Sequence, residues 1–364
     1  MTSSSSSTSP SRKKLPKEFF DAHHHFLDTR TTHNDGTSFQ AFLGTLVPNE
    51  VYLPVQYHCD IVKPLQAAGV TLVGSTHVEC MPDNGVAEIT WVESMSNTTR
   101  EECTVQAIVA SADLTKPTLE KELIQLRKAS PQKLKGIRWI LDCVGNFQGG
   151  GTTATHVATS RHDGIDYLRG SAGGYEGSVL PEFERGFALL EQHGLSFDLQ
   201  CAPVQLPAAA ELVRKYPNIP VVIDHLGKPR TLLGPDSDLD ATQPNEKEWN
   251  DWRVGMKAMA ALPNVYVKIS MLGYSVPGWI RTPTRMALIK QLVTETVTLF
   301  GPQRCMVATN FWKNAALSDS DGLSDVGPDA VQLLRWLNEF LIEYSEEDRH
   351  AIFCGTAKAF YKVN

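Results

Sequence analysis

Residues 18–26 read EFFDAHHHF, a short apolar run that ends in three consecutive histidines before a phenylalanine. Residues 220–227 read PVVIDHLG and have the same form, with an aspartate and a histidine following the apolar part. Nearly continuous apolar runs are typical of parallel strands that are covered by helices on both faces. The two stretches therefore predict a parallel α/β fold whose polar side chains gather where the strands end.

Six further runs of this kind alternate with helical patterns up to the end of the chain. Eight strands, each followed by a helix, predict a (β/α)8 TIM barrel. An open doubly wound sheet is the alternative, but no Gly-x-Gly-x-x-Gly turn follows a strand, so a nucleotide cofactor is not indicated. The predicted strands cover residues 18–26, 70–78, 103–111, 134–141, 195–201, 220–227, 265–272 and 305–312.

Three connections are longer than is usual between barrel elements, namely residues 27–57, 142–180 and 228–245. Each would follow the carboxyl end of a strand, where a barrel builds its site. Loops of this length are usually functional lids or disordered inserts. We therefore expect long βα loops around the site, with residues 142–180 as either a lid or a solvated insert.

The composition is that of a globular protein, with 42% hydrophobic and 21% charged residues in a chain of 364. The formal net charge of −7 argues against nucleic acid or an anionic membrane as a partner. No apolar run approaches the roughly 18 residues that span a membrane. The expected partner is a small-molecule substrate, and a homodimer is the assembly to test, since barrel enzymes often form dimers.

Residues 1–17 read as a flexible Ser-rich tail, with an organelle import signal as the weaker alternative. Residues 18–364 are predicted to form a single barrel domain. The seven cysteines include no Cys-x-x-Cys pair. This pattern favours reduced thiols in the cytoplasm over a disulfide framework or a zinc–thiolate site.

The histidines of the first strand are the strongest candidates for chemistry. Side chains alternate along a strand, so His23 and His25 should share a face with Asp21, while His24 points the other way. Two imidazoles so placed can hold one divalent ion or polarise one carbonyl oxygen. A chance run of histidines is the bland alternative. His225 closes the sixth strand and joins this group.

Further polar residues end other strands. His77 and Gln200 are candidate substrate contacts, as are Tyr52 and Trp312, which could line the pocket. Asp224 should point away from His225 and make a structural hydrogen bond towards the helix layer. A lysine inside a barrel is costly unless it is paired. We therefore expect Lys268 to form a buried ion pair with Asp198.

At this point the chain resembles a known family. The segments FDAHHHF, GIRWIL, FDLQ, VVIDHLGKP, VYVKIS and FGPQRCMVATNF occur in the order found in amidohydrolase-related metal-dependent hydrolases. The most similar branch contains the sugar-lactone and 2-pyrone-4,6-dicarboxylate lactonases. The resemblance implies a (β/α)8 barrel in which His23, His25 and His225 act in catalysis and are the candidate metal ligands. It also implies that Arg138 holds a substrate carboxylate.

The sequence departs from the wider superfamily at two positions. Arg138 stands where a carbamate-forming lysine would bridge two metals, so a binuclear centre is not expected. Asn310 stands where these hydrolases usually place the aspartate that deprotonates water, and an amide cannot accept that proton. Another base, such as His225 or a loop residue (His156, His162 or Asp163), is one explanation. Chemistry that needs no base, or ligand binding without catalysis, are the others.

The function predicted from these residues is a lactonase that opens a small carboxylated or polyhydroxylated lactone. Carbonyl polarisation by the histidines would stabilise the oxyanion as water adds. One divalent metal, zinc or manganese, is an expected cofactor if the three histidines bind it together, while direct action on a carbonyl needs none. The alternatives are a decarboxylase of an aromatic or dienoic acid and a biosynthetic isomerase or cyclase.

Overall fold

The computed structural model describes residues 15–30, 40–46, 50–98, 104–143, 165–169, 178–229, 232–233, 243–276, 279–280, 282–310 and 329–364. Eight parallel strands form one sheet in which the order along the chain is also the order in space. The strands are β1 (Glu18–His24), β4 (Thr71–Val78), β5 (Val105–Ser111), β6 (Leu134–Ile140), β7 (Ser196–Gln200), β8 (Val221–Ile223), β9 (Val265–Ile269) and β10 (Cys305–Val307).

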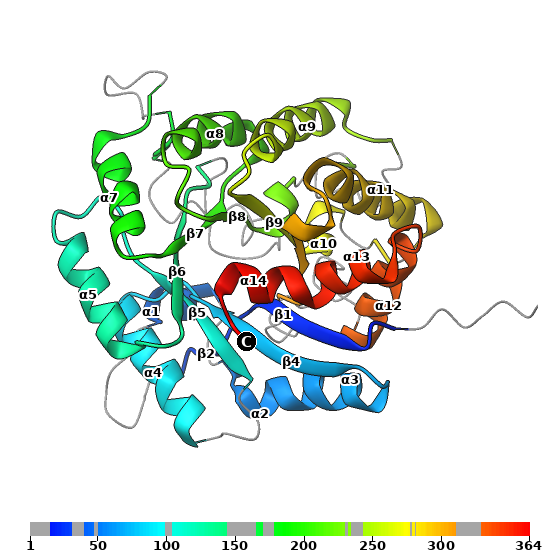
Figure 1. The fold of residues 1–364 in the computed structure, drawn as a ribbon, viewed down its shortest axis with the longest axis horizontal. Helices are drawn as coiled ribbons and strands as arrows, with labels where there is room; N and C mark the ends of the chain where they lie inside the picture. Colours follow the sequence, from blue (N-terminus) through cyan, green and yellow to red (C-terminus); the bar gives the residue numbers. More distant parts are fainter. Residues whose placement is uncertain are drawn as a thin grey trace, which may run out of the picture.

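The sheet curls into a nearly closed barrel, because its two outermost strands, β1 and β10, come into contact (Figure 1). Just beyond β10, the Asn310 amide donates a hydrogen bond of 2.8 Å to the His23 carbonyl oxygen. The predicted TIM barrel is therefore confirmed, and all eight predicted strands are present with somewhat shorter bounds.

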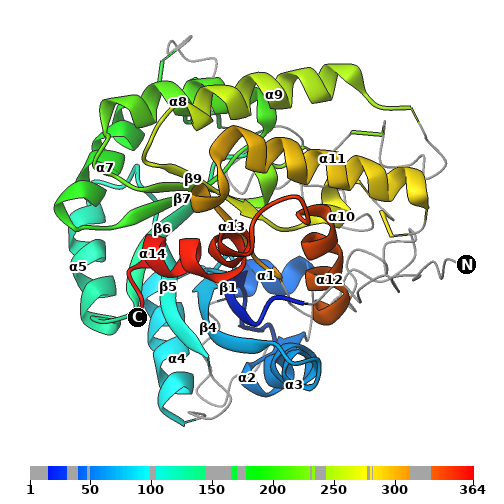
Figure 2. The same ribbon diagram turned by 45° about the vertical axis from the view of Figure 1, so that its right-hand side comes forward.

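Helices surround the barrel in both ribbon views (Figures 1 and 2). They include α4 (Gly85–Thr98), α5 (Leu119–Ala129), α7 (Pro181–Gln192), α8 (Leu206–Lys215), α9 (Glu246–Ala260), α11 (Pro283–Phe300) and α12 (Ala330–Phe340). The apolar sides of these helices pack on the outer faces of the strands and form the larger of two hydrophobic clusters. Sequence signals set several helix starts: Asn245 caps α9 and Thr282 caps α11.

The second hydrophobic cluster fills the barrel interior, where Phe20, Val109 and Met306 meet Phe360 and Tyr361. The last two residues belong to α14 (Thr356–Tyr361), which follows α13 (Glu346–His350) and the π-helical segment η6 (Ala351–Gly355). This C-terminal segment contacts the starts of β1 and β10 and thus covers the amino-terminal end of the barrel. The carboxyl ends of the strands are left for the site.

The connection predicted over residues 27–57 contains structure of its own. Its elements are β2 (Leu27–Asp28), α1 (Ala41–Leu46), β3 (Val51–Tyr52) and α2 (Pro54–Tyr57), which leads into η1 (His58–Val62) and α3 (Lys63–Ala67). Strands β2 and β3 pair as a small antiparallel sheet. Most of the other two long connections lies outside the described residues. None of the helices that the structure describes is both long and apolar enough to cross a membrane.

Candidate active site

Four cationic or imidazole side chains converge inside the barrel, near the carboxyl ends of the strands. They are His23 from β1, Arg138 from β6, His225 just after β8 and Lys268 from β9, and each is at most 3% exposed. The His23 and His225 ring centroids are 4.8 Å apart. His23 Nδ1 lies 3.2 Å from Lys268 Nζ, and His23 Nε2 lies 3.5 Å from Arg138 Nη1. Three of the predicted site residues are thus brought together around His23.

His25 forms an imidazole pair with His23, and the two Nε2 atoms are 3.2 Å apart. His25 Nδ1 lies 2.8 Å from the Val78 carbonyl oxygen, which can only accept. His25 therefore carries its proton on Nδ1 and turns the lone pair of Nε2 towards His23. Since the Lys268 ammonium donates to His23 Nδ1, the His23 proton sits on Nε2. A directed chain of hydrogen bonds results, from Lys268 through both histidines to Val78.

The imidazoles of the site are held neutral. Burial lowers the pKa of His23 and His225 well below the ordinary value of 6.5. Burial and the nearby Arg138 guanidinium lower the pKa of His25 to about 3. Neutral imidazoles have one lone pair each, so they can accept a proton or ligate a metal at physiological pH.

Asp224 lies within this group, which corrects the expectation that it points towards the helix layer. Its Oδ1 is 3.0 Å from Lys268 Nζ and 3.5 Å from His23 Nδ1, and its Oδ2 is 3.6 Å from Arg138 Nη1. Strand alternation does not apply here, because β8 ends at Ile223 and His225 adopts a positive φ of 55°. Burial acts to raise the pKa of Asp224, but Lys268, His225 and Arg138 together lower it.

The predicted ion pair between Lys268 and Asp198 is present and fully buried. The Tyr361 hydroxyl donates to Asp198 Oδ2 over 3.2 Å, and the Lys268 ammonium lies over the Tyr361 ring. Lys268 therefore links the carboxylates of Asp198 and Asp224 to His23. The sequence analysis treated this lysine as a structural element of the barrel and missed its contact with the catalytic histidine.

Arg138 is engaged by the protein itself. Its Nε donates to Glu79 Oε1 over 2.6 Å, its Nη2 donates to the Glu79 carbonyl oxygen over 2.5 Å, and its Nη1 donates to Gln200 Oε1 over 3.1 Å. The guanidinium is 3% exposed. The implied role as the anchor of a substrate carboxylate would require it to give up part of this pairing. Gln200 lies beside Arg138, as expected for a residue near the site.

Asn310 occupies the position of the usual base at the edge of the site. It has a left-handed backbone with φ 52°, a conformation that asparagine tolerates better than most residues. The side-chain Oδ1 is buried, and none of the described residues donates a hydrogen bond to it. The amide is thus positioned to contact a water or a ligand. Phe311 and Trp312 lie outside the described residues, and so do His156, His162 and Asp163.

A bulge in β1 separates Asp21 from the histidine pair, contrary to the shared face expected from alternation. The pairing with β4 shifts register between Asp21 and His24. Asp21 therefore accepts hydrogen bonds from Tyr57 and Thr309, and His24 turns to Ser75. Burial raises the pKa of Asp21 to about 6.

His77 and Tyr52 are buried on this same outer side of β1 and β4. His77 Nδ1 accepts a hydrogen bond from the Phe26 amide, and its ring stacks on Phe26. Its Nε2 faces Glu88 at 3.8 Å. Burial and the nearby carboxylate of Asp60 raise the pKa of Tyr52. The contacts recorded for both residues are with this outer layer, so their predicted substrate contacts remain predictions.

The described residues include a group whose chemistry suits one divalent ion. The ligand atoms of His23, Asp224 and His225 all lie within 4.8 Å of one another and are buried. Two imidazoles and a carboxylate are donors that zinc accepts, with water as a further ligand. The group differs from the predicted set by containing Asp224 in place of His25. The residues fit a metal, although the neighbouring Lys268 and Arg138 would repel a cation.

Comparison with known proteins agrees with this architecture. The model of the Amidohydrolase family matches residues 20–363. A protein of Sinorhizobium fredii, known as uncharacterized protein y4mH, is 26% identical over 349 residues, covering 94% of this chain and 98% of its own. L-fucono-1,5-lactonase of Burkholderia ambifaria is 27% identical over 187 residues, which cover 50% of this chain and 56% of the lactonase.

Solved structures show the same fold. An amidohydrolase of Burkholderia multivorans, solved with bound zinc, has a TM-score of 0.62 and 23% identity, covering 95% of this chain and 99% of the other. A putative 2-pyrone-4,6-dicarboxylic acid hydrolase of Pseudomonas putida has a TM-score of 0.59 and 14% identity, covering 96% and 98% of the two chains. These likenesses extend over nearly the whole barrel.

Proposed function

Because the chain belongs to the Amidohydrolase family, we propose that this hydrolase opens the ring of a small lactone. The observation that carries the proposal is the neutral pair His23–His25, with Nε2 atoms 3.2 Å apart, set beside two buried cations. Such a group can stabilise negative charge on a carbonyl oxygen without first losing a proton. The partial similarity to L-fucono-1,5-lactonases supports the same reaction.

Carbonyl polarisation falls to His23 and Arg138. In the free protein the His23 Nε2 proton is directed at His25 Nε2. A lactone carbonyl oxygen entering beside them would compete for this proton and for Arg138 Nη1, which lies 3.5 Å from His23 Nε2. Both donors are fixed by buried partners, so little reorganisation accompanies the development of charge. His25 then keeps its bond to Val78 and orients the pair.

His225 is the proposed base, because Asn310 cannot accept a proton. Its Nδ1 is 2.8 Å from Ser270 Oγ, which holds the ring in place. With the proton on Nδ1, the Nε2 lone pair takes a proton from water as the water oxygen bonds to the carbonyl carbon. The tetrahedral intermediate then collapses, the ring C–O bond breaks, and His225 returns the proton to the leaving ring oxygen. Asn310 would orient the water through its side-chain amide.

The pairing of Arg138 bears on the substrate class. Glu79 already holds the guanidinium through two contacts and neutralises its charge. The further polar groups at the site, Gln200 and Asn310, are neutral amides suited to hydroxyl groups. We therefore favour a polyhydroxylated lactone over a carboxylated one. If a divalent ion binds to His23, Asp224 and His225, it would supply Lewis-acid polarisation of the carbonyl.

The reaction is tested with two substrate panels, sugar δ-lactones and 2-pyrone carboxylates, in water enriched in ¹⁸O. The expected result is turnover of sugar lactones, with one solvent oxygen in the carboxylate product. Release of carbon dioxide from aromatic or dienoic acids would instead establish a decarboxylase. A product without solvent oxygen would establish an isomerase or cyclase, and either result would overturn the proposal.

A further inference from the structure

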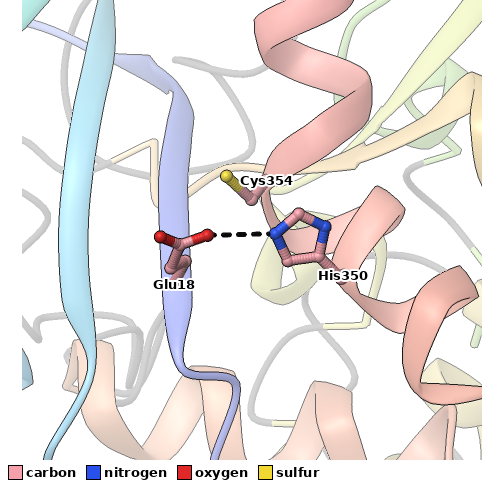
Figure 3. Close-up of side chains that lie close together, drawn as sticks. All are labelled: Glu18, His350 and Cys354. Carbon is pink, nitrogen blue, oxygen red and sulfur yellow. Dashed lines mark hydrogen bonds and ion pairs between the residues drawn. The ribbon is translucent and has the colours of Figure 1, made fainter.

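A second group of metal-binding side chains lies at the opposite end of the barrel from the candidate active site. Glu18 is the first residue of β1, His350 ends α13, and Cys354 lies in η6 (Figure 3). Strand β1 and η6 are in direct contact. The ends of the described chain therefore bring three different ligand types to one place.

The geometry of this group is compact. His350 Nε2 lies 3.1 Å from Glu18 Oε2, and the ligand atoms of all three side chains lie within 4.8 Å of one another. His350 and Cys354 are four positions apart, so they project from the same side of the helical segment. The segment from residue 351 to 355 is π-helical, a rare conformation that often marks functional sites.

Burial divides the group into an accessible part and a shielded part. The side chains of Glu18 and His350 are 50% and 54% exposed, so an ion can reach them from solvent. Cys354 is 2% exposed and packs in the interior cluster beside Phe20 and Ala357. Figure 3 shows its sulfur turned towards the space between the carboxylate and the imidazole. A thiolate there would be protected from solvent once bound.

The exposed Glu18–His350 pair by itself would contribute little to stability, since surface ion pairs are worth about 0–1 kcal/mol. A thiol, an imidazole and a carboxylate together are donors that zinc accepts, with water completing four-coordination. We propose that Glu18, His350 and Cys354 form a zinc site that fastens the C-terminal segment to the start of β1. Binding displaces the thiol proton to solvent and forms the Zn–S bond.

Cobalt(II) is the probe that separates this site from the active site. The group formed by His23, Asp224 and His225 contains no sulfur. A thiolate-to-cobalt charge-transfer band in the near ultraviolet therefore reports the Cys354 site alone. We expect this band to appear on titration of the full chain with cobalt chloride, to saturate at one thiolate-bound cobalt per chain, and to disappear on adding zinc chloride.

The variants test each ligand. Cys354→Ser should abolish the band, and Glu18→Gln and His350→Gln should each weaken zinc binding at least about tenfold, which corresponds to 1.4 kcal/mol. The last two residues are exposed, so these variants keep the fold. Cys59→Ser removes an exposed cysteine elsewhere and should leave the band unchanged. His225→Asn should also leave it unchanged.

Zinc should raise the melting temperature of the wild-type chain, because a ligand that binds the folded state stabilises it. This increment should be smaller in Glu18→Gln and His350→Gln. A cobalt complex of the wild-type chain without a thiolate band would overturn the proposal. A band that survives in Cys354→Ser, or equal zinc affinity in wild type and both exposed variants, would do the same.

Discussion

Lys268 Nζ lies 3.2 Å from His23 Nδ1 inside the barrel, and the same ammonium is paired with Asp198 and Asp224. The lysine thereby sets which nitrogen of His23 carries the proton, and it holds two buried carboxylates in place. It acts on the reaction through His23 and is a positioning residue. Structure and chemistry are coupled at this one side chain, and variants can separate them.

Lys268→Met should lower both stability and turnover. Removing one partner of a buried ion pair leaves uncompensated carboxylates and costs roughly 3–5 kcal/mol. The loss of the donor to His23 should reduce kcat by roughly 10- to 100-fold, as for other groups that orient a catalytic imidazole. Urea unfolding and steady-state kinetics measure the two effects.

The double variant Lys268→Met with Asp198→Asn is the matched control, because it removes one of the stranded charges. It should recover part of the lost stability but none of the lost kcat. Recovery of kcat together with stability would mean that Lys268 serves the fold alone.

His225→Asn should reduce kcat/KM for a sugar lactone by roughly 100- to 10,000-fold, the usual contribution of a general base. Asparagine is the better replacement here than alanine, because residue 225 has φ 55°. The melting temperature should change little. Ser270→Ala, which removes only the partner of His225 Nδ1, should cost less activity. Near wild-type turnover in His225→Asn would exclude His225 as the base.

Asn310→Gly separates the amide of Asn310 from its backbone conformation. Glycine adopts φ 52° freely, so stability should be preserved, whereas Asn310→Ala should cost about 1 kcal/mol. Both variants should lose turnover, because both lack the amide that orients water. Asn310→Asp restores a carboxylate and should remain active. Full activity of Asn310→Gly would show that the amide takes no part.

Glu79→Gln should change substrate preference. The neutral amide keeps an acceptor for Arg138 Nε but no longer neutralises the guanidinium. KM for a carboxylated lactone should therefore fall about tenfold, equivalent to 1.4 kcal/mol, while KM for a neutral sugar lactone stays the same. Equal KM values for both classes before and after the change would show that Arg138 does not face the substrate.

Stability should decrease as the pH falls below 6.5. Four buried histidines have lowered pKa values in the folded protein, so below 6.5 the unfolded chain binds protons that the folded chain does not. Each such proton costs about 1.4 kcal/mol per pH unit. Asp21, whose pKa is raised to about 6, opposes this trend between pH 6 and its ordinary value of 3.8.

Urea unfolding across this pH range measures the balance, and the four histidines should outweigh the aspartate. A free energy of unfolding that is flat or rising between pH 6.5 and 5 would mean that the site histidines are protonated in the folded state.

The sequence by itself determined the barrel and most of the residues at its centre. Each strand is a short apolar run, and this local pattern needs no knowledge of distant contacts. His23, His25 and His225 were found because parallel strands bring their carboxyl ends to one edge. The pairing of Lys268 with Asp198 followed from the cost of burying an unpaired lysine.

Tertiary structure decided what alternation and spacing could not. A positive φ at His225 turns Asp224 into the site, and a bulge in β1 turns Asp21 out of it. Glu79 comes from a different strand end and takes up the charge of Arg138. Glu18 and His350 are separated by 332 positions. Such contacts arise only when the barrel closes, because local backbone geometry and long-range packing leave no periodic trace in the sequence.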